Sequence, residues 1–242
     1  MAVLKGKVAL VTGGSRGIGR AIAISLAEAG AAVAVNYLSK AGEAKAVVEA
    51  IHKLGGRAIS VGADVSLAAA VNGMVAGIER ELGPVDILIN NAGIAINRPV
   101  DELTEEDFDR TMAVNLKSVF LCTQAVLPGM RKRRWGRIVN ISSGAARGAG
   151  GIGPHYNASK AGMEGMTRGY AARLVKDGIT VNAVAPSLIE TDMVTAVASS
   201  AARIPLGRFG KPEECAKIVM MLLDNEYMTG QTVALSGGLS FV

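Results

Sequence analysis

Short apolar segments alternate with longer helical segments along the chain, and this alternation constrains the fold more than any other feature of the sequence. The short segments are nearly continuous in apolar residues, as strands are when helices cover both faces of a sheet. A strand–helix–strand rhythm of this kind predicts a parallel, doubly wound sheet. We expect about seven strands, at residues 7–12, 32–36, 58–61, 86–90, 136–142, 180–185 and 231–235. We expect helices near residues 17–29, 40–54, 67–82, 104–130, 155–177 and 212–224.

Several predicted helix ends carry capping residues. Gly30 and Gly55 follow the first two helices, where glycine accommodates the left-handed backbone that often ends a helix. Ser66 and Thr104 precede two later helices and are predicted N-caps, and Thr104 is expected to form a capping box with Asp107.

The composition excludes several classes of protein. Half of the 242 residues are hydrophobic, and no repeat, linker or charge block divides the chain, so we expect one α/β domain over residues 1–242 and not a disordered chain. The net charge of +5 favours anionic ligands, and aromatic residues at 4% offer few of the stacking platforms typical of nucleic-acid binding. No apolar run approaches the ~18 residues of a membrane span, and the N-terminal segment has no signal-peptide pattern.

The cysteines and histidines indicate neither a disulfide framework nor a metal site. Cys122 and Cys215 lie far apart in the sequence, which suits free thiols in a reducing cytoplasm. His52 and His155 are accompanied by no Cys-x-x-Cys pair. We therefore expect a cytoplasmic protein that binds no metal, no nucleic acid and no membrane.

A glycine-rich turn joins the first predicted strand to the first predicted helix, with glycines at Gly13, Gly17 and Gly19. Such a turn lets the backbone come close to a pyrophosphate and directs a helix N-terminus at it. Because a strand precedes the turn and a helix follows it, the pattern predicts a Rossmann-type dinucleotide site. The alternative is a tight turn without a ligand.

The end of the second predicted strand indicates which dinucleotide would bind. A site for NAD usually carries Asp or Glu about 20 residues after the turn, on the ribose 2′-hydroxyl; here Asn36 stands at that place. Arg16 and Ser15 in the turn offer donors that suit a 2′-phosphate. We therefore expect NADP(H) as the cofactor, the alternative being that Arg16 is only a solvated loop residue.

Tyr156 and Lys160 lie at the start of the helix predicted at residues 155–177. Their spacing of four places both side chains on one helix face. A free tyrosine has a pKa of about 10, and a neighbouring ammonium lowers it. Such a tyrosine can protonate a developing alkoxide or deprotonate an alcohol near neutral pH. The spacing alone is common in helices, but its place directly after the fifth strand favours a catalytic pair.

Two further polar features lie near that strand. Ser142 and Ser143 end it, where the carboxyl ends of strands face the ligand crevice. One of them can donate a hydrogen bond to a carbonyl oxygen, because extended neighbours point to opposite sides; the alternative is a pair of turn-capping hydroxyls. Asn115, in the middle of the helix predicted at residues 104–130, is a poor helix former. The residues leave open whether it kinks the helix or belongs to a catalytic relay.

Together these motifs resemble the short-chain dehydrogenase/reductase family over nearly the whole chain. The glycine turn from Thr12 to Gly19 matches the family's cofactor turn, and the Asn-Asn-Ala-Gly segment at residues 90–93 matches its fourth-strand motif. Asn115, Ser143, Tyr156 and Lys160 fall where the family's catalytic tetrad falls. The cofactor-binding residues that the resemblance implies are Gly13, Ser15, Arg16, Gly17, Ile18, Gly19, Asn36, Asp64, Val65, Asn91, Ala92, Gly93, Tyr156, Lys160, Pro186, Ser187, Ile189 and Thr191.

The resemblance also implies a role for each member of the tetrad. Tyr156 would be the acid in carbonyl reduction and Ser143, favoured over Ser142 by its spacing from the tyrosine, would polarise the carbonyl. Lys160 would bind the nicotinamide ribose and lower the pKa of the tyrosine. Asn115 would hold a water that links Lys160 to solvent, while hydride passes from the nicotinamide to the carbonyl carbon.

Within the family the chain most resembles the bacterial 3-oxoacyl-[acyl-carrier-protein] reductases, through segments at residues 136–141, 178–186, 189–193 and 230–238. This resemblance implies NADPH-dependent reduction of a 3-oxoacyl thioester to a 3-hydroxyacyl thioester in fatty acid biosynthesis. It also implies a homotetramer formed through the two long helices and the last strand. The alternative is an NADP(H)-dependent reductase or dehydrogenase of small ketones, alcohols or sugars that uses no carrier protein.

Several features bear on the substrate. The basic residues 131–134 would suit an acidic acyl carrier protein as a partner, the alternative being a solvated helix end. Ser187 follows Pro186 where glycine is usual, and Asp177 stands where a basic residue is frequent. The segment at residues 194–204 predicts a substrate lid shorter than usual. The glycine-rich segment at residues 148–153 predicts a mostly apolar pocket wall with few charged anchors.

Overall fold

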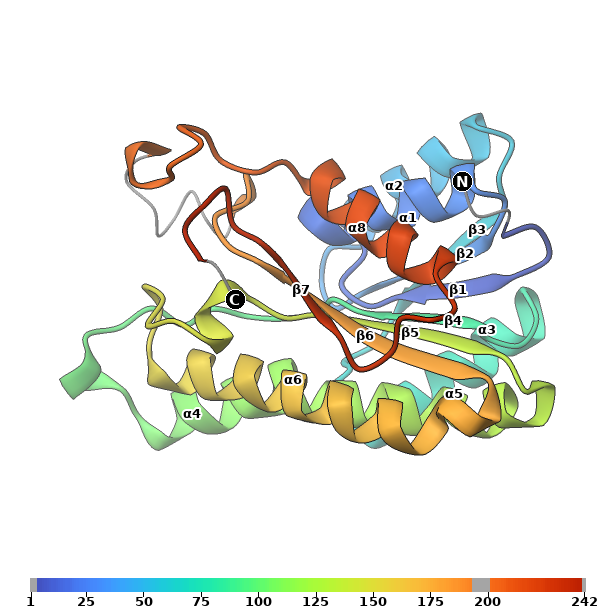
Figure 1. The fold of residues 1–242 in the computed structure, drawn as a ribbon. Coiled ribbons are helices and arrows are strands. Elements are labelled where there is room, and N and C mark those ends of the chain that lie inside the picture. The colour runs from blue at the N-terminus through green and yellow to red at the C-terminus, as the bar shows by residue number, and fades with distance from the viewer. Residues whose placement is uncertain (1–3, 193–200, 241–242) are drawn as a thin grey trace.

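The computed structural model describes residues 4–192 and 201–240. Their centre is one parallel sheet in the order β3-β2-β1-β4-β5-β6-β7 (Figure 1). The strands are β1 (Val8–Val11), β2 (Ala32–Tyr37), β3 (Ala58–Gly62), β4 (Ile87–Asn90), β5 (Gly136–Ile141), β6 (Ile179–Pro186) and β7 (Thr232–Leu235). The α-helices are α1 (Gly17–Glu28), α2 (Ala41–Lys53), α3 (Ala68–Glu81), α4 (Glu105–Met112), α5 (Ser118–Arg133), α6 (Pro154–Leu174) and α8 (Pro212–Asp224).

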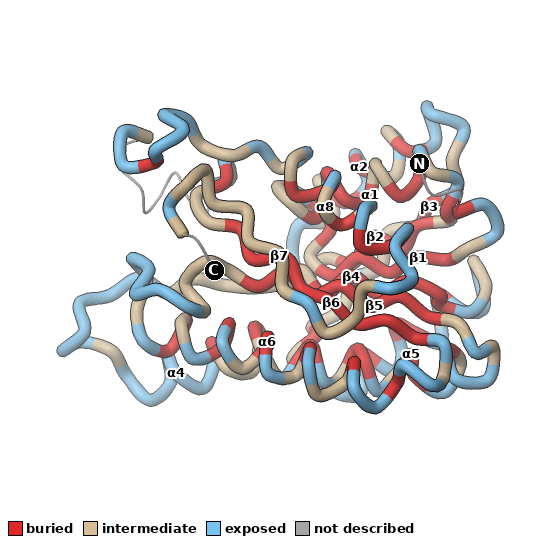
Figure 2. Tube along the Cα trace, in the orientation of Figure 1, coloured by how far each residue is buried: buried red, intermediate tan, exposed pale blue. Residues whose placement is uncertain are grey.

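Helices cover both faces of the sheet, which confirms the predicted doubly wound α/β fold. Along β1, Leu10 packs into one apolar cluster and Val11 into the other, as alternating side chains of a strand must. Helices α1, α2 and α8 lie on one face, and α3, α5 and α6 on the other (Figure 1). The central strands are therefore buried on both sides, as Figure 2 shows. All seven strands occur where the sequence predicts them.

The sheet order creates the crevice in which such folds bind ligands. Strand β1 pairs with β2 on one side and with β4 on the other, so the chain changes direction across the sheet between these neighbours. The segments that leave the carboxyl ends of β1 and β4 diverge at this point, and ligands of open α/β sheets bind there.

Two of the predicted helix boundaries are wrong. The helix expected at residues 104–130 is divided: α4 ends at Met112, a π-helical turn covers Ala113–Lys117, and α5 follows. Ser66 does not cap α3, because its hydroxyl and its backbone N–H both donate to Asp64 Oδ1, at 2.6 and 2.9 Å. The nearby carboxylate satisfies Ser66 in an Asx turn, so the helix starts later.

Other capping predictions are confirmed. Thr104 and Asp107 form the reciprocal capping box at the start of α4. Gly30 and Gly55 follow α1 and α2 with φ values of +96° and +79°, the left-handed backbone that glycine adopts without strain.

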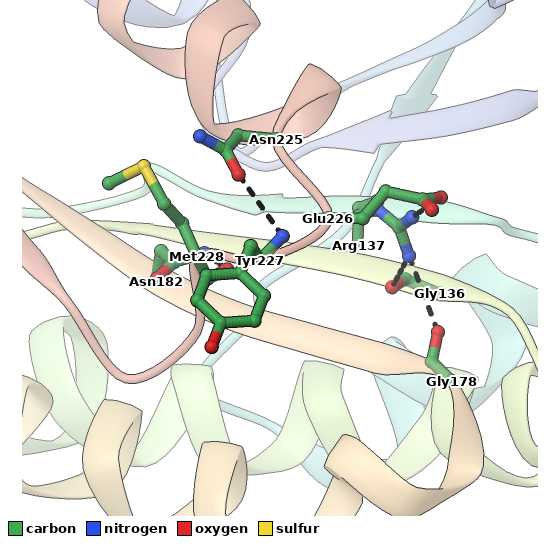
Figure 3. Close-up of polar contacts among 8 residues, drawn as sticks. All are labelled: Gly136, Arg137, Gly178, Asn182, Asn225, Glu226, Tyr227 and Met228. Atoms are coloured by element: carbon green, nitrogen blue, oxygen red, sulfur yellow. Dashed lines mark hydrogen bonds and ion pairs between the residues drawn. The ribbon is translucent and has the colours of Figure 1, made fainter.

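Hydrogen bonds and an ion pair join the loop before β7 to strands β5 and β6 (Figure 3). The buried Arg137 guanidinium donates to Glu226 Oε1 at 2.7 Å and to the Gly178 carbonyl oxygen at 3.3 Å. Asn182 Nδ2 donates to the Met228 carbonyl oxygen at 2.8 Å. These bonds fasten the segment that leads into β7 to its neighbouring strands, away from the crevice at the carboxyl ends.

Candidate active site

A cavity of about 1530 Å³ lies at the carboxyl ends of the strands. Every candidate residue of the sequence analysis lines it except Asn115. The candidates in the lining are Gly13, Ser15, Arg16, Gly17, Ile18, Gly19, Asn36, Asp64, Val65, Asn91, Ala92, Gly93, Ser143, Tyr156, Lys160, Pro186, Ser187, Ile189 and Thr191. The topology thus brings together residues from seven separate parts of the sequence.

The turn after β1 is built so that only glycine fits at its key position. Gly13 has a φ of +59°, and a Cβ there would lie 2.9 Å from the Cα of Ala92. Arg16, the N-cap of α1, makes no side-chain capping bond, and the first turn of α1 contains no acid. The exposed N–H groups and the positive end of the helix dipole therefore face the cavity without a competing carboxylate. The residues present fit the pyrophosphate of a dinucleotide.

Thr12 and Asn91 lock this turn to the end of β4. The Thr12 hydroxyl accepts from the backbone N–H groups of Asn91 and Ala92, at 2.9 and 3.0 Å. Asn91 Nδ2 donates to the carbonyl oxygens of Thr12 and Gly13, both at 2.9 Å. The Asn91 amide nitrogen is thus fully used in hydrogen bonds to backbone carbonyl oxygens. The sequence motifs do not predict this role of Thr12, although a hydroxyl at the end of a buried strand is a signal for it.

The side chain of Asn36 also forms hydrogen bonds with backbone groups. Its Oδ1 accepts from Gly13 N at 3.2 Å, and its Nδ2 donates to the carbonyl oxygens of Val61 and Ala63, at 3.3 and 3.1 Å. The side chain is buried and joins the glycine turn to the end of β3. An amide can do this without placing a negative charge beside a 2′-phosphate.

Arg16 lies at the rim of the cavity in an ion pair. Its Nη1 is 2.8 Å from Asp192 Oδ2, and both side chains are mostly exposed. Directly beside this pair, a Cβ on Gly17 would lie 3.2 Å from Thr191 Cγ2. The glycine turn and the segment after β6 therefore touch across the crevice.

Tyr156 and Lys160 lie one turn apart on α6, and both are buried. Lys160 Nζ donates to the Ile141 carbonyl oxygen at 2.8 Å and lies 5.8 Å from the centre of the tyrosine ring. Burial lowers the pKa of Lys160 to about 8. Burial raises the pKa of Tyr156, and a hydrogen bond with Ser143 offsets part of this rise. The resemblance implied that Lys160 lowers this pKa; in this structure desolvation of Tyr156 outweighs the hydrogen bond with Ser143, and the pKa is raised.

The two serines after β5 face in different directions, as the sequence analysis expected. Ser143 is hydrogen-bonded with Tyr156 in the cavity. Ser142 is buried, and its Oγ lies 3.3 Å from both the Lys160 carbonyl oxygen and Glu164 Oε1. Ser143, Tyr156 and Lys160 thus form one cluster in the cavity; Ser142 also lines it, but its hydroxyl is bonded to α6.

Asn115 lies behind the cavity wall, fully buried in the π-helical turn. Its Oδ1 accepts from Ile94 N at 2.8 Å, and its Nδ2 donates to Ile94 O at 3.0 Å and to Ser159 Oγ at 3.2 Å. Gly93 separates it from the lysine, because a Cβ there would lie 3.3 Å from Asn115 Oδ1 and 3.7 Å from Lys160 Nζ. The helix irregularity left open by the sequence is therefore present, and it lies next to the cluster.

The cavity wall carries more charge than the glycine-rich segment at residues 148–153 predicts. Arg110, Arg147 and Arg203 all line the cavity. A Cβ on Gly144 would lie 2.5 Å from Ser187 Oγ, so this serine packs against the loop after β5. Residues 193–200, which form most of the predicted lid at residues 194–204, lie outside the described residues.

The described part of the chain also bears on metal binding, membrane spans and the cysteines. No group of three or more His, Cys, Asp or Glu side chains there could hold a metal ion. None of its helices has the length and apolarity needed to cross a membrane. Cys122 and Cys215 are free and buried, and burial raises the pKa of each thiol to about 12.

Comparisons with known proteins agree with this geometry. The family model for short chain dehydrogenase matches residues 7–202. The chain is 42% identical over 242 residues to the 3-oxoacyl-[acyl-carrier-protein] reductase FabG of Staphylococcus aureus, covering 96% of this chain and 98% of that protein. It is 41% identical over 244 residues to the (2S)-[(R)-hydroxy(phenyl)methyl]succinyl-CoA dehydrogenase subunit BbsD of Thauera aromatica, covering 98% of each.

A solved structure extends the agreement to three dimensions. The crystal structure of a short-chain type dehydrogenase/reductase from Mycobacterium marinum matches with a TM-score of 0.92 and 35% identity, covering 98% of this chain and 96% of that one. The chain belongs to the short-chain dehydrogenase/reductase family and is an oxidoreductase.

Proposed function

We propose that the protein reduces a ketone to a secondary alcohol with NADPH, and that its substrate is a 3-oxoacyl thioester. The observation that carries the proposal is the cluster of Ser143, Tyr156 and Lys160 in one cavity with the glycine turn. The cofactor supplies the hydride; the chain supplies binding, orientation and the proton. The names of relatives at 41–42% identity, which act on acyl-carrier-protein and CoA thioesters, support the substrate class.

Tyr156 is the proton donor in this proposal. Its pKa is raised by burial, so the hydroxyl is neutral at physiological pH and holds the proton that the developing alkoxide requires. Ser143, bonded with the same hydroxyl, donates to the carbonyl oxygen and stabilises the charge that forms there. Lys160, charged below a pKa of about 8, provides a cation beside the tyrosine and a donor for the ribose hydroxyls. Asn115 lies behind the wall and would hold a water that links Lys160 to solvent.

The preference for NADPH rests on Arg16 and on the missing carboxylate. Arg16 and Ser15 line the rim of the cavity, and Asn36 occupies the position where an acid would repel a 2′-phosphate. Asp64 and Val65 line the same end and would hold the adenine. The comparisons establish only a family that uses NAD(P)(H), so the choice between the two cofactors belongs to this proposal.

One observation favours the alternative substrate class, small ketones, alcohols or sugars without a carrier protein. Three of the four basic residues expected to dock a carrier, at residues 131–134, are engaged within the chain. Arg131 pairs with Asp177 at 2.8 Å, Arg133 pairs with Asp86 at 3.1 Å, and Arg134 donates to the backbone. These bonds match the alternative stated above, in which residues 131–134 are a solvated helix end. They leave less unpaired positive charge for an acidic partner.

The deciding experiment measures the initial rate of NADPH consumption with a 3-oxoacyl carrier-protein thioester, a 3-oxoacyl-CoA and a panel of small ketones. Fast turnover of the thioesters supports the proposal. Turnover of small ketones alone overturns the thioester part and moves the function to a general carbonyl reductase. Turnover of the CoA ester but not of the carrier-protein ester removes the carrier protein from the proposal.

Tyrosine variants test the mechanism in the same assay. Tyr156→Phe removes the proton donor and should lower kcat by at least about a hundredfold. Tyr170→Phe is the matched control on the same helix, where the hydroxyl accepts a hydrogen bond from Gln124 at 3.0 Å away from the cavity lining. Full activity of Tyr156→Phe would contradict the mechanism.

We further propose one domain over residues 1–242 and a cytoplasmic location. The free thiols suit a reducing compartment.

We also propose a homotetramer. Strand β7 is an edge of the described sheet and pairs only with β6 there. Phe108 and Phe120 are exposed on α4 and α5. Unpaired strand edges and exposed aromatic residues are typical of assembly surfaces. Light scattering at several protein concentrations would determine the oligomeric state.

A further inference from the structure

Glu164 is a buried carboxylate for which the proposed reaction has no direct use. It lies on α6, one turn after Lys160 and two turns after Tyr156, and only 4% of it is exposed. An acid is rarely buried unless it is paired.

The carboxylate binds both ends of the loop that carries Ser143. At the start of the loop, Ser142 Oγ lies 3.3 Å from Glu164 Oε1. At its end, Arg147 Nε donates to Glu164 Oε2 at 2.9 Å. One side chain of α6 therefore closes the segment 142–147 onto the helix.

Bonds within the loop make it a compact unit. Ser143 Oγ accepts from Ala145 N at 3.2 Å. The Gly144 carbonyl oxygen accepts from the backbone N–H groups of Arg147 and Gly148, at 3.3 and 3.1 Å. The attachment of this compact loop at Glu164 connects Ser143 with the helix that carries Tyr156.

We propose that Glu164 is a positioning residue that fixes the Ser143 loop to the helix bearing Tyr156 and Lys160, with Arg147 as its partner. This inference rests on the proposed function, because it takes the roles of Ser143 and Tyr156 from there. Glu164 touches no reacting atom; it acts through the loop. Misplacement of a polarising group by about 1 Å can cost a hundredfold in rate, so a remote carboxylate can have a large kinetic effect.

The test compares Glu164→Gln with Asp86→Asn. Asp86 is a matched control, since it is a buried carboxylate that also pairs with an arginine, at 3.1 Å from Arg133 Nε, but it does not line the cavity. Each variant keeps the size of the side chain and removes one charge. The measurements are the melting temperature, the dissociation constant for NADPH, and kcat and KM for the best substrate from pH 6 to above pH 10, because burial raises the pKa of Tyr156 from its ordinary value of 10.

We expect Glu164→Gln to lower kcat by at least about tenfold, with the NADPH dissociation constant within about twofold of wild type. The pKa seen in its kcat profile should rise, because the hydrogen bond with Ser143 holds the pKa of Tyr156 down. Asp86→Asn should lose as much thermal stability and keep kcat within about twofold. A kcat of Glu164→Gln that stays within twofold of wild type overturns the proposal.

Two additions keep the result decisive. If Glu164→Gln does not fold, Arg147→Met removes the partner at the more exposed end of the pair and should show the same loss of kcat; unchanged kcat there overturns the proposal. Tyr156→Phe is measured in parallel. If it keeps full activity, the proposed function fails and this inference fails with it. If it is inactive while Glu164→Gln is fully active, only the positioning role is refuted.

Discussion

Replacement of Lys160 by methionine should change how the stability of the protein depends on pH. The lysine is only 4% exposed, and burial lowers its pKa from 10.5 to about 8. At 1.36 kcal/mol for each pKa unit, holding this ammonium in the folded chain at neutral pH costs about 3 kcal/mol. Methionine fills a similar space and carries no charge.

The direction of the effect follows from proton binding. Below pH 8 the lysine is protonated in both the folded and the unfolded chain, so the cost of burying the charge is present in full. Between pH 8 and 10.5 the folded chain has released this proton while the unfolded chain still holds it. Unfolding then takes up a proton, and the free energy of unfolding rises with pH. The wild type should gain about 2.5 kcal/mol relative to Lys160→Met between pH 7 and pH 10.

Urea unfolding of both proteins at pH 7, 8, 9 and 10 and at one protein concentration measures this difference. Other titrating groups are common to both chains and cancel, and the hydrogen bond lost at the Ile141 carbonyl adds an offset that does not vary with pH. Lys53→Met, at an exposed helix end, is the control and should show a nearly flat difference. A difference between wild type and Lys160→Met that stays constant from pH 7 to pH 10 would refute the reasoning.

Three further changes test other parts of the structure. Gly13→Ala should lower the free energy of unfolding by more than about 1 kcal/mol, because alanine is strained at a φ of +59°; Gly42→Ala, in open space within α2, should not destabilise in the same urea assay. Thr104→Ala should cost about 1 kcal/mol through loss of the capping box, seen as a lower midpoint in urea. Asp192→Asn should release Arg16 and tighten NADPH binding about two- to fivefold in a fluorescence titration. Equal tightening of NADH would show that Arg16 does not recognise the 2′-phosphate.

The fold was predictable because one signal repeats through the whole chain. Each strand is buried on both faces, so its sequence is apolar without alternation, and this pattern does not depend on distant contacts. The prediction of one continuous helix at residues 104–130 was wrong because of a single residue. Asn115 prefers bonds with the backbone of Ile94 to a regular helical environment, and propensity alone does not reveal a partner 21 residues away.

The candidate site separates into residues that sequence can find and residues that it cannot. Tyr156, Lys160 and the glycine turn are found because their chemistry depends on spacing within one element. Glu164 depends on Arg147, 17 residues before it on another element, and on a loop that folds back onto α6. In sequence it is one more charged residue on a helix, where a solvated surface is the usual interpretation. Only its burial reveals that it must have a partner, and the partner in turn connects it with the loop of Ser143. Residues that position a site rather than react in it are therefore found through burial and pairing.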